Sequence, residues 1–419
     1  MLDRAINFIS SLRLTVVCLC LAIVLIFAGT LAQVYLGLYA VQSQFFRSFF
    51  VYWTPEGSHW RIPVLPGGWL LGVVLLVNLL AAHIKRFKWS TKKIGIFMVH
   101  GGLILLLVGQ FFTEIFQRES SMLIDIGGSK NYSEDNRRNE LAIIDTTAAD
   151  HDAVTSIPES LLAKGGPIRA PGLPFTIEVE KYFPNSAPAG PMSGGGEKLK
   201  ATQGVGQRLL FTEAQRTQLM DDEDKPAALV RLVSPQGSLG EWTVSTWLSK
   251  YPYPQRLQDN LGSLLGAPIS APQEFKCGGH TYQIALRPVR YYKPYTITLV
   301  EFRHEVYDGT DIPKNFASKI HLTDRAAGED RDVLIYMNNP LRYRGETFYQ
   351  ASFKPDDKGT ILQVVKNPAA PTPYVACGLV GLGLITQFLM HLVGFARRRL
   401  QAGAPAKVPA AQPKLKEAV

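Results

Sequence analysis

Three histidines lie near the basic ends of three apolar segments. They are His83, two residues before a lysine, His100, seven residues after one, and His391, six residues before an arginine cluster. Histidine is the usual protein ligand of haem iron. Two or three imidazoles at a similar depth in a membrane could therefore hold a haem.

His100 is the deepest of the three, inside the almost wholly apolar stretch Ile94–Phe112. An imidazole in hydrocarbon pays a desolvation penalty unless it is hydrogen-bonded or bound to a metal. Gly101 and Gly102 next to it have no side chains, so that a neighbouring helix or a flat ligand can come close to the backbone there. Glu114 lies near the same helical face, about 21 Å away along the axis. The alternative role for His100 is a hydrogen bond to a polar group on another helix.

The two shallower histidines have a simpler explanation. A polar side chain near a helix end can extend to the headgroups, and we interpret His83 and His391 in this way. Gln387 lies four residues before His391 and shares its helical face, which gives that segment a polar stripe. Both histidines stay open as alternative haem ligands to His100.

The long polar segment offers few candidates for chemistry. Cys277-Gly-Gly-His280 has metal-like spacing, but two glycines between strand-forming residues favour a hairpin turn, and a zinc site would need further ligands. His304 and His321 fall in predicted strands, where we interpret them as ordinary sheet residues. None of the four cysteines forms Cys-x-x-Cys, which excludes a thioredoxin-like centre and a c-type haem attachment site. No catalytic residue is predicted, and whether the chain takes part in an enzyme stays open.

The net charge of +9 over 419 residues could suggest a nucleic-acid partner. Much of the positive charge, however, is clustered beside apolar segments, as membrane topology requires. We therefore exclude nucleic-acid binding.

Four transmembrane helices are predicted, because each apolar run can cross about 30 Å of hydrocarbon. A cleaved signal peptide is the alternative for the first, but its apolar character continues past Ala32. Basic residues place the N-terminus, the second loop and the C-terminal tail, which we expect to be disordered, in the cytoplasm. The predicted order is N-terminus 1–13, helix 14–40, aromatic loop 41–66, helix 67–84, basic loop 85–93, helix 94–113, extracytoplasmic domain 114–373, helix 374–396 and tail 397–419.

The extracytoplasmic domain is predicted to be β-rich, with a sandwich or open-barrel fold. Its short segments rich in Val, Ile, Thr and Tyr, such as Thr281–Arg287 and Tyr295–Val306, are separated by turn-forming clusters. We expect a mobile loop over 185–206 and a helix in Ser245–Tyr251 or Gln255–Leu265. The loop 41–66 carries FFRSFFVYW, an aromatic composition that suits the headgroup layer.

Four stretches of the chain resemble the ResB (CcsB) proteins of cytochrome c biogenesis. They are LPGGWLLGVVLLVNLLAAHIKRF, KIGIFMVHGGLILLLVGQF, NNPLRYRGETFYQASF and QFLMHLVGFARRR. The resemblance runs from about Ser11 to Arg399 and includes the order of three spans, outer domain and one span. The membrane segments match best, whereas Ile126 to about Glu274 matches only in general character.

This resemblance implies a subunit of a cytochrome c synthase in the bacterial cytoplasmic membrane, with its large domain in the periplasm. The expected partner is a haem-handling membrane protein of the CcsA (ResC) type, and together they would deliver haem b to apocytochrome c. The resemblance implies that this partner carries a tryptophan-rich haem-handling motif, and because this chain has no such stretch, the partner should be a separate polypeptide. By motif, His100 would be one axial ligand, paired with a histidine of the partner. A thiol-reducing, thioredoxin-like protein is a further expected partner.

The competing function is a membrane-anchored sensor or scaffold that binds another protein or a small ligand without haem. Under this alternative, the three histidines would serve only the packing and the interfaces of the spans.

The predicted topology can be tested with reporter fusions. Because basic loops stay in the cytoplasm, fusions after Lys88 and Arg399 should report a cytoplasmic position. Fusions near Trp53 and Gly240 should report an external one. A cytoplasmic signal at Gly240 would contradict the orientation and, with it, the assignment of His100.

Overall fold

The computed structural model describes residues 2–55, 60–86, 90–189, 197–217, 223–249, 272–309, 313–354 and 357–402. The predicted helix Gln255–Leu265 and the tail beyond 402 lie outside these residues. The chain divides into two compact units, which are described separately. The membrane unit comprises Met1–Ala28, Gln44–Phe116 and Pro368–Val419, and the β unit comprises Gly29–Ser43 and Gln117–Asn367.

Within the described residues, four helices are long and apolar enough to cross a membrane, so the chain is a multi-pass membrane protein. They are α2 (Leu12–Leu36), α4 (Gly68–Arg86), α5 (Ile94–Phe116) and α8 (Thr372–Ala402). Three are N-terminal and one is C-terminal, which confirms the predicted fold class. Shorter elements are α1 (Leu2–Ile9), α3 (Leu38–Val41), the π-helix η1 (Gln42–Phe46), strands β1 (Phe50–Trp53) and β2 (Ile62–Pro66), and the 3₁₀ helix η2 (Thr91–Lys93).

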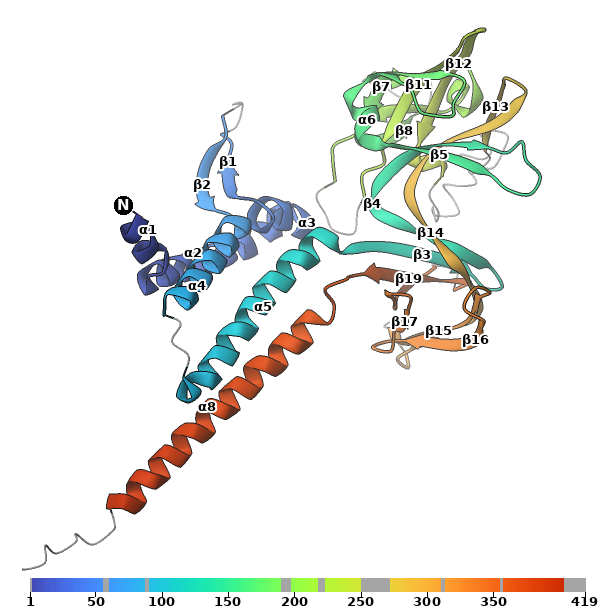
Figure 1. Cartoon of the computed structure of the whole chain (residues 1–419). Helices are drawn as coiled ribbons and strands as arrows, with labels where there is room; N and C mark the ends of the chain where they lie inside the picture. The colour runs from blue at the N-terminus through green and yellow to red at the C-terminus, as the bar shows by residue number, and fades with distance from the viewer. Residues whose placement is uncertain are drawn as a thin grey trace, which may run out of the picture. The chain divides into compact units, whose positions relative to one another are not determined.

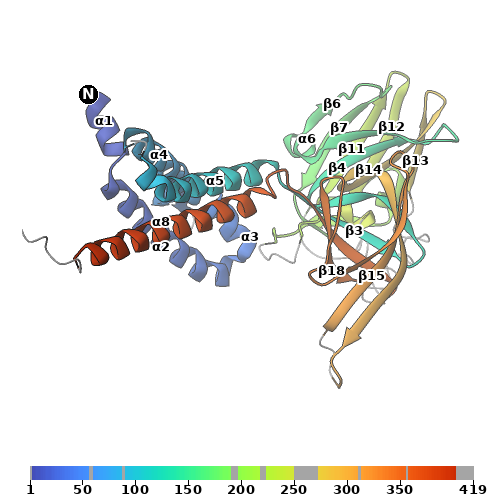
Figure 2. The ribbon, with the colours of Figure 1, turned by 60° about the horizontal axis from the view of Figure 1, so that its bottom comes forward.

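Helices α5 and α8 lie side by side (Figures 1 and 2). Gly95, Gly102 and Gly109 recur every seven residues on α5 and all three are buried. A Cβ atom at Gly102 would lie 2.8 Å from the carbonyl oxygen of Ala376, and one at Gly95 would lie 2.6 Å from that of Gly383. The two helices therefore touch through their backbones, which is the packing that small residues permit in a membrane.

Asn78 is a buried polar residue of α4. Its amide nitrogen donates to the carbonyl oxygens of Ile9, at 2.5 Å, and Ser11, at 3.1 Å. Its side-chain oxygen accepts from the Thr15 hydroxyl at 2.6 Å. Asn78 thus satisfies carbonyl groups where the chain breaks between α1 and α2, which would be costly to leave unpaired in hydrocarbon.

The described residues of the β unit form three sheets. The largest is a nearly closed, barrel-like sheet of ten strands, with the order β16-β15-β14-β4-β3-β19-β18-β17, in which β13 adds to β14 and β5 to β4. The others have the orders β12-β11-β7-β6 and β8-β10-β9.

The strands and short helices of the β unit are, in chain order, β3 (Arg118–Asp125), β4 (Ser129–Asp145), β5 (Ala153–Pro158), α6 (Glu159–Lys164), β6 (Gly166–Ile168), β7 (Thr176–Phe183), β8 (Ser186–Ala189), β9 (Lys198–Leu199), η3 (Gly204–Gln207), β10 (Leu210–Glu213), β11 (Ala227–Ser234), β12 (Gly237–Ser245), η4 (Thr246–Leu248), β13 (Gln273–Cys277), β14 (His280–Val306), β15 (Pro313–Asp324), β16 (Glu329–Tyr336), β17 (Leu341–Tyr343), β18 (Glu346–Phe353) and β19 (Gly359–Lys366).

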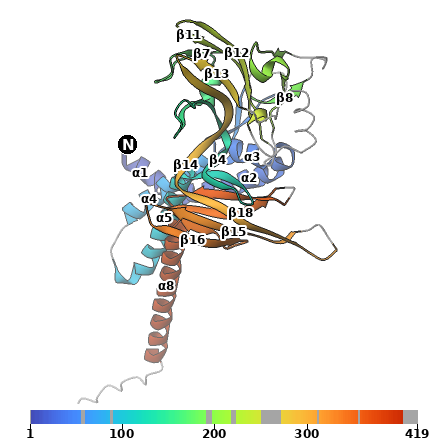
Figure 3. The ribbon, with the colours of Figure 1, turned by 90° about the vertical axis from the view of Figure 1, so that its right-hand side faces the viewer.

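Strand β14 joins two hydrophobic cores of the β unit (Figure 3). Ile284 near its start packs with β11 and β12, whereas Ile297 packs with β15 and β19. The sequence predicted two separate strands here, Thr281–Arg287 and Tyr295–Val306, with Pro288 and Pro294 between them. The chain instead continues as one strand, and its pairing with β4 shifts register at both prolines.

Two other local predictions differ from the structure. The predicted loop over 185–206 contains β8, β9 and part of η3, with 190–196 outside the described residues. The predicted helix Ser245–Tyr251 is only the short 3₁₀ turn η4 within the described part. The segment 185–206 is rich in Gly, Pro, Ala and Ser, but pairing of β8 and β9 with β10 decides its conformation.

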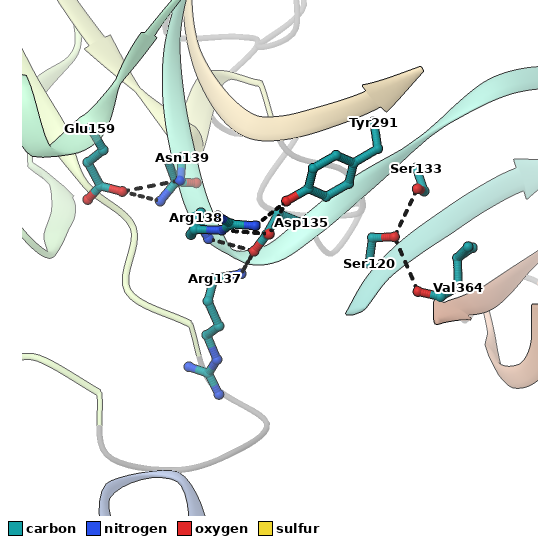
Figure 4. Close-up of polar contacts among 9 residues, drawn as sticks. All are labelled: Ser120, Ser133, Asp135, Arg137, Arg138, Asn139, Glu159, Tyr291 and Val364. Carbon is teal, nitrogen blue, oxygen red and sulfur yellow. Dashed lines mark hydrogen bonds and ion pairs between the residues drawn. The ribbon is translucent and has the colours of Figure 1, made fainter. Parts of the chain in front are cut away.

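Ionic side chains occupy the stretch of β14 between the two cores. The Arg287 guanidinium donates to Glu140 at 2.9 Å with both side chains 5% exposed. Tyr291 donates to Asp135 at 2.7 Å, and Asp135 also accepts from Arg138 (Figure 4). Burial, together with the hydrogen bond to Asp135, raises the pKa of Tyr291 to about 12. Such pairing is what permits charged groups between two apolar cores.

The contact between α5 and α8 can be tested by adding a methyl group to Gly102. The Gly102→Ala change should destabilise the chain by about 1–3 kcal/mol, because the new Cβ meets the backbone of Ala376 and neither helix can yield without separating. Thermal unfolding in detergent measures the effect. Gly101→Ala is the matched control, since a Cβ there meets only Leu379, at 3.8 Å. Equal stability of the two variants would contradict the packing.

A second prediction concerns His321 on β15. Its Nδ1 lies 2.7 Å from Asp332 and its Nε2 lies 2.7 Å from Asp330. These hydrogen bonds raise the pKa of His321. Lys319, at 2.9 Å from Asp332, is the neighbouring cation. Because the folded chain holds this proton more tightly, the stabilisation is complete below the unfolded pKa of about 6.5 and is lost as pH rises through the raised folded pKa.

Unfolding midpoints measured from mildly acidic to alkaline pH should show this loss. His321→Gln removes the titrating group and keeps a polar side chain, so its midpoint should change less over the same window. Identical pH profiles for the two proteins would show that the pair of aspartates does not hold a proton on His321.

Candidate functional site

His100 lies on the side of α5 away from α8. It precedes Gly102 by two residues, which places it about 160° around the helix from the glycine face. Its Nδ1 is 2.9 Å from the carbonyl oxygen of Ile96 in the preceding turn. Because a carbonyl only accepts, Nδ1 carries the proton, and in the neutral ring the lone pair is on Nε2. That is the tautomer in which an imidazole can bind a metal.

The structure brings His83 next to His100. The ring centroids are 5.8 Å apart, with 34° between the ring planes. His83 also meets Phe97 edge to face, at 5.6 Å between centroids. Both histidines are half-buried, so helices α4 and α5 present two imidazoles at one depth near the Lys93 end of α5.

His391 is arranged differently on α8. Its Nε2 is 2.8 Å from the amide nitrogen of Gln387 on the same helix, and its side chain is exposed. The predicted polar stripe of Gln387 and His391 is therefore present as a hydrogen bond. Because this bond occupies Nε2, His391 is the least suited of the three imidazoles to bind a metal there.

The two glycines after His100 have different surroundings. Val380 and Ala376 of α8 cover Gly102, so this position gives room to a helix and not to a ligand. At Gly101 an added Cβ would meet only Leu379. Of the two predicted neighbours, a helix and a flat ligand, the structure places the helix at Gly102.

The residues around His83 and His100 fit a haem in the chemistry of their donors. The Ile96 carbonyl orients the His100 ring and fixes its proton, as second-shell groups do for metal-binding histidines. His83 supplies a second imidazole from a different helix. Glu114 takes no part, because it pairs with Arg47 at 2.5 Å near the other end of α5.

The histidines and the cysteine of the β unit that could have bound a metal have structural contacts instead. Cys277 and His280 flank a tight turn in which Gly278 and Gly279 have φ values of 61° and 83°, so the hairpin interpretation agrees with the structure. His280 contacts Asp145 at 2.8 Å, and His304 contacts Asp357 at 3.2 Å. Within the described residues, no group of three or more His, Cys, Asp or Glu side chains could hold a metal ion.

A polar hollow of the β unit was missed by the sequence analysis. Its volume is about 210 Å³, and Arg137, Asn139, Glu159 and Lys225 are among its lining residues. Glu159 accepts from the Asn139 side chain at 3.0 Å (Figure 4) and also from Tyr182. These residues are scattered along the chain, and no spacing in the sequence signals that they meet.

Comparison with known proteins gives two matches. Residues 273–361 match the model of the ResB-like family. The chain is 33% identical to Protein NrfI of Wolinella succinogenes over 96 residues. This match covers 23% of the chain. The matched part is 11% of the length of that relative.

The family model matches the part of the β unit from β13 to β19, where the sequence motif NNPLRYRGETFYQASF also lies. The four spans and the β-rich domain between the third and fourth of them agree with the same assignment. Residues 273–361 are therefore similar to the ResB-like family.

Proposed function

We propose that this chain is a haem-handling subunit of the cytochrome c biogenesis machinery and that His100 binds the haem iron. The observation that supports the proposal best is the pair of imidazoles from α4 and α5, with ring centroids 5.8 Å apart. An ionisable side chain at this depth in a span is a functional-site candidate by default.

The residues of the site have separate tasks in this proposal. The Ile96 carbonyl keeps the proton on Nδ1 of His100, so that Nε2 can bind iron. Helix α8 packs against the glycine face of α5 and does not contact the opposite side of α5, where the His100 imidazole lies. His83 lies against the His100 ring and restricts its rotation. A bound haem would supply iron as the acceptor for these nitrogen lone pairs.

The proposed partner is a CcsA-type membrane protein that supplies the second axial histidine and the outer haem-attachment site. Apocytochrome c is the proposed acceptor of the haem, and a thiol-reducing protein would keep its cysteines open. The proposed orientation places both termini in the cytoplasm and the β unit outside, since basic residues flank the spans at Lys93 and Arg397. In this orientation the His83–His100 pair faces the cytoplasmic half of the membrane.

The polar hollow favours the alternative function, a membrane-anchored sensor without haem. With a volume of about 210 Å³ and charged walls, it has the size for a small polar ligand. The two functions differ in one simple observable: only the haem-handling subunit should copurify with a Soret band when its partner and ample haem are present.

Replacing His100 tests the proposed function. In the complex with the partner, His100→Ala should lose haem and stop cytochrome c assembly while the chain still inserts, because the nitrogen that binds iron is gone. Added imidazole should restore part of the Soret absorbance, since the deleted ring leaves a space of its own size. The measurements are the haem spectrum of the purified complex and the yield of mature cytochrome c.

His391→Ala is the matched control, because this histidine is bonded within α8 and exposed. It should keep its haem. His83→Ala should keep haem with a shifted spectrum if the partner supplies the second ligand, whereas loss equal to that of His100→Ala would assign the second ligand to His83. Full haem content and normal maturation in His100→Ala would refute the proposal.

A further inference from the structure

The segment before α4 forms an isolated two-stranded hairpin (Figure 1). Strand β1 (Phe50–Trp53) pairs antiparallel with β2 (Ile62–Pro66), and neither strand contains a charged residue. An isolated hairpin of this size is marginally stable in water. Its composition would also be an aggregation liability if water surrounded it.

Most of its apolar side chains are uncovered. Val51 is buried at 5% exposure, but Tyr52 is 51%, Trp53 57% and Val64 53% exposed. Phe50 belongs to the same exposed group and lies near Tyr52, with ring centroids 6.4 Å apart. Contiguous apolar surface of this kind marks a place where something other than water is bound.

Hydrogen bonds fix the hairpin to the start of the span α4. The Gly67 N–H donates to the Phe49 carbonyl at 2.8 Å, and the Trp69 N–H donates to that of Ser48 at 3.2 Å. A Cβ atom at Gly67 would lie 2.1 Å from the Ser48 carbonyl oxygen, so only glycine permits this approach. The hairpin therefore cannot move away from the first turn of α4.

Aromatic and ionic contacts indicate the depth of the membrane at which the first turn of α4 lies. Trp69 lies 6.3 Å from Phe49 and 5.8 Å edge to face from Phe111 of α5, measured between ring centroids. Arg47 and Glu114 form an ion pair. Arg47 lies two residues before Phe49, and Glu114 lies three residues after Phe111. A belt of aromatic rings next to charged groups is the signature of the interface between hydrocarbon and water.

We infer that the β1–β2 hairpin is a lipid-docking element whose exposed rings lie in the headgroup layer of the bilayer. The occupant of its surface is lipid, because the attached span holds it at that depth whether or not a protein partner is present. Tyr and Trp suit this layer, since one end of each ring system is apolar and the other can hydrogen-bond. The inference does not depend on haem binding.

Quenching by brominated lipid tests the inference on the full chain reconstituted in phosphatidylcholine vesicles. Some vesicles carry bromine near the glycerol and others carry it deep in the acyl chains. Trp53→Phe should remove part of the lipid-quenched tryptophan emission, and the loss should be larger with the shallow bromine. The control is Trp242→Phe, since Trp242 is 5% exposed in the core of the β unit and should contribute no lipid-quenched emission.

Unchanged lipid quenching in Trp53→Phe would overturn the inference. If the emission lost in this variant is instead quenched by aqueous acrylamide, the hairpin lies in water. If neither quencher reaches it, protein covers the hairpin, and this outcome also overturns the assignment to lipid.

Discussion

The backbone contact between α5 and α8 is the constraint on which the membrane unit depends. In hydrocarbon there is no hydrophobic driving force between helices, so they associate through close packing and hydrogen bonds. Gly95, Gly102 and Gly109 provide such packing by removing side chains along one face of α5. This contact fixes the rotation of α5, and the rotation turns His100 away from α8.

Three other polar contacts lie in the membrane unit. Asn78 binds the carbonyls at the break between α1 and α2, Arg47 pairs with Glu114, and Gln387 contacts His391. His100 also satisfies Nδ1 on its own helix, but its Nε2 lone pair remains as the group that can bind iron. Its chemistry therefore differs from that of His391, although both are histidines in spans.

The sequence was sufficient for the spans and for the β-rich class, because apolar length and strand-forming composition are local properties. It was not sufficient for β14, where two strands were predicted and register shifts let the chain continue as one. The approach of His83 to His100 could not be predicted from the sequence either, since this contact depends on how α4 and α5 are rotated about their axes. The same limit applies at Gly102, where the sequence left a neighbouring helix and a flat ligand as alternatives, because its neighbour on α8 is almost 280 residues away in the chain.

The most direct test of the account asks which polypeptide supplies the nitrogen bound to iron. The complex can be assembled from this chain labelled with heavy-nitrogen histidine and an unlabelled partner, and the ferric haem examined by pulsed electron paramagnetic resonance. The account predicts hyperfine coupling between the iron spin and a labelled nitrogen, and predicts its disappearance when His100 is replaced. Coupling to unlabelled nitrogen alone would contradict the account, because every ligand would then come from the haem itself or from the partner.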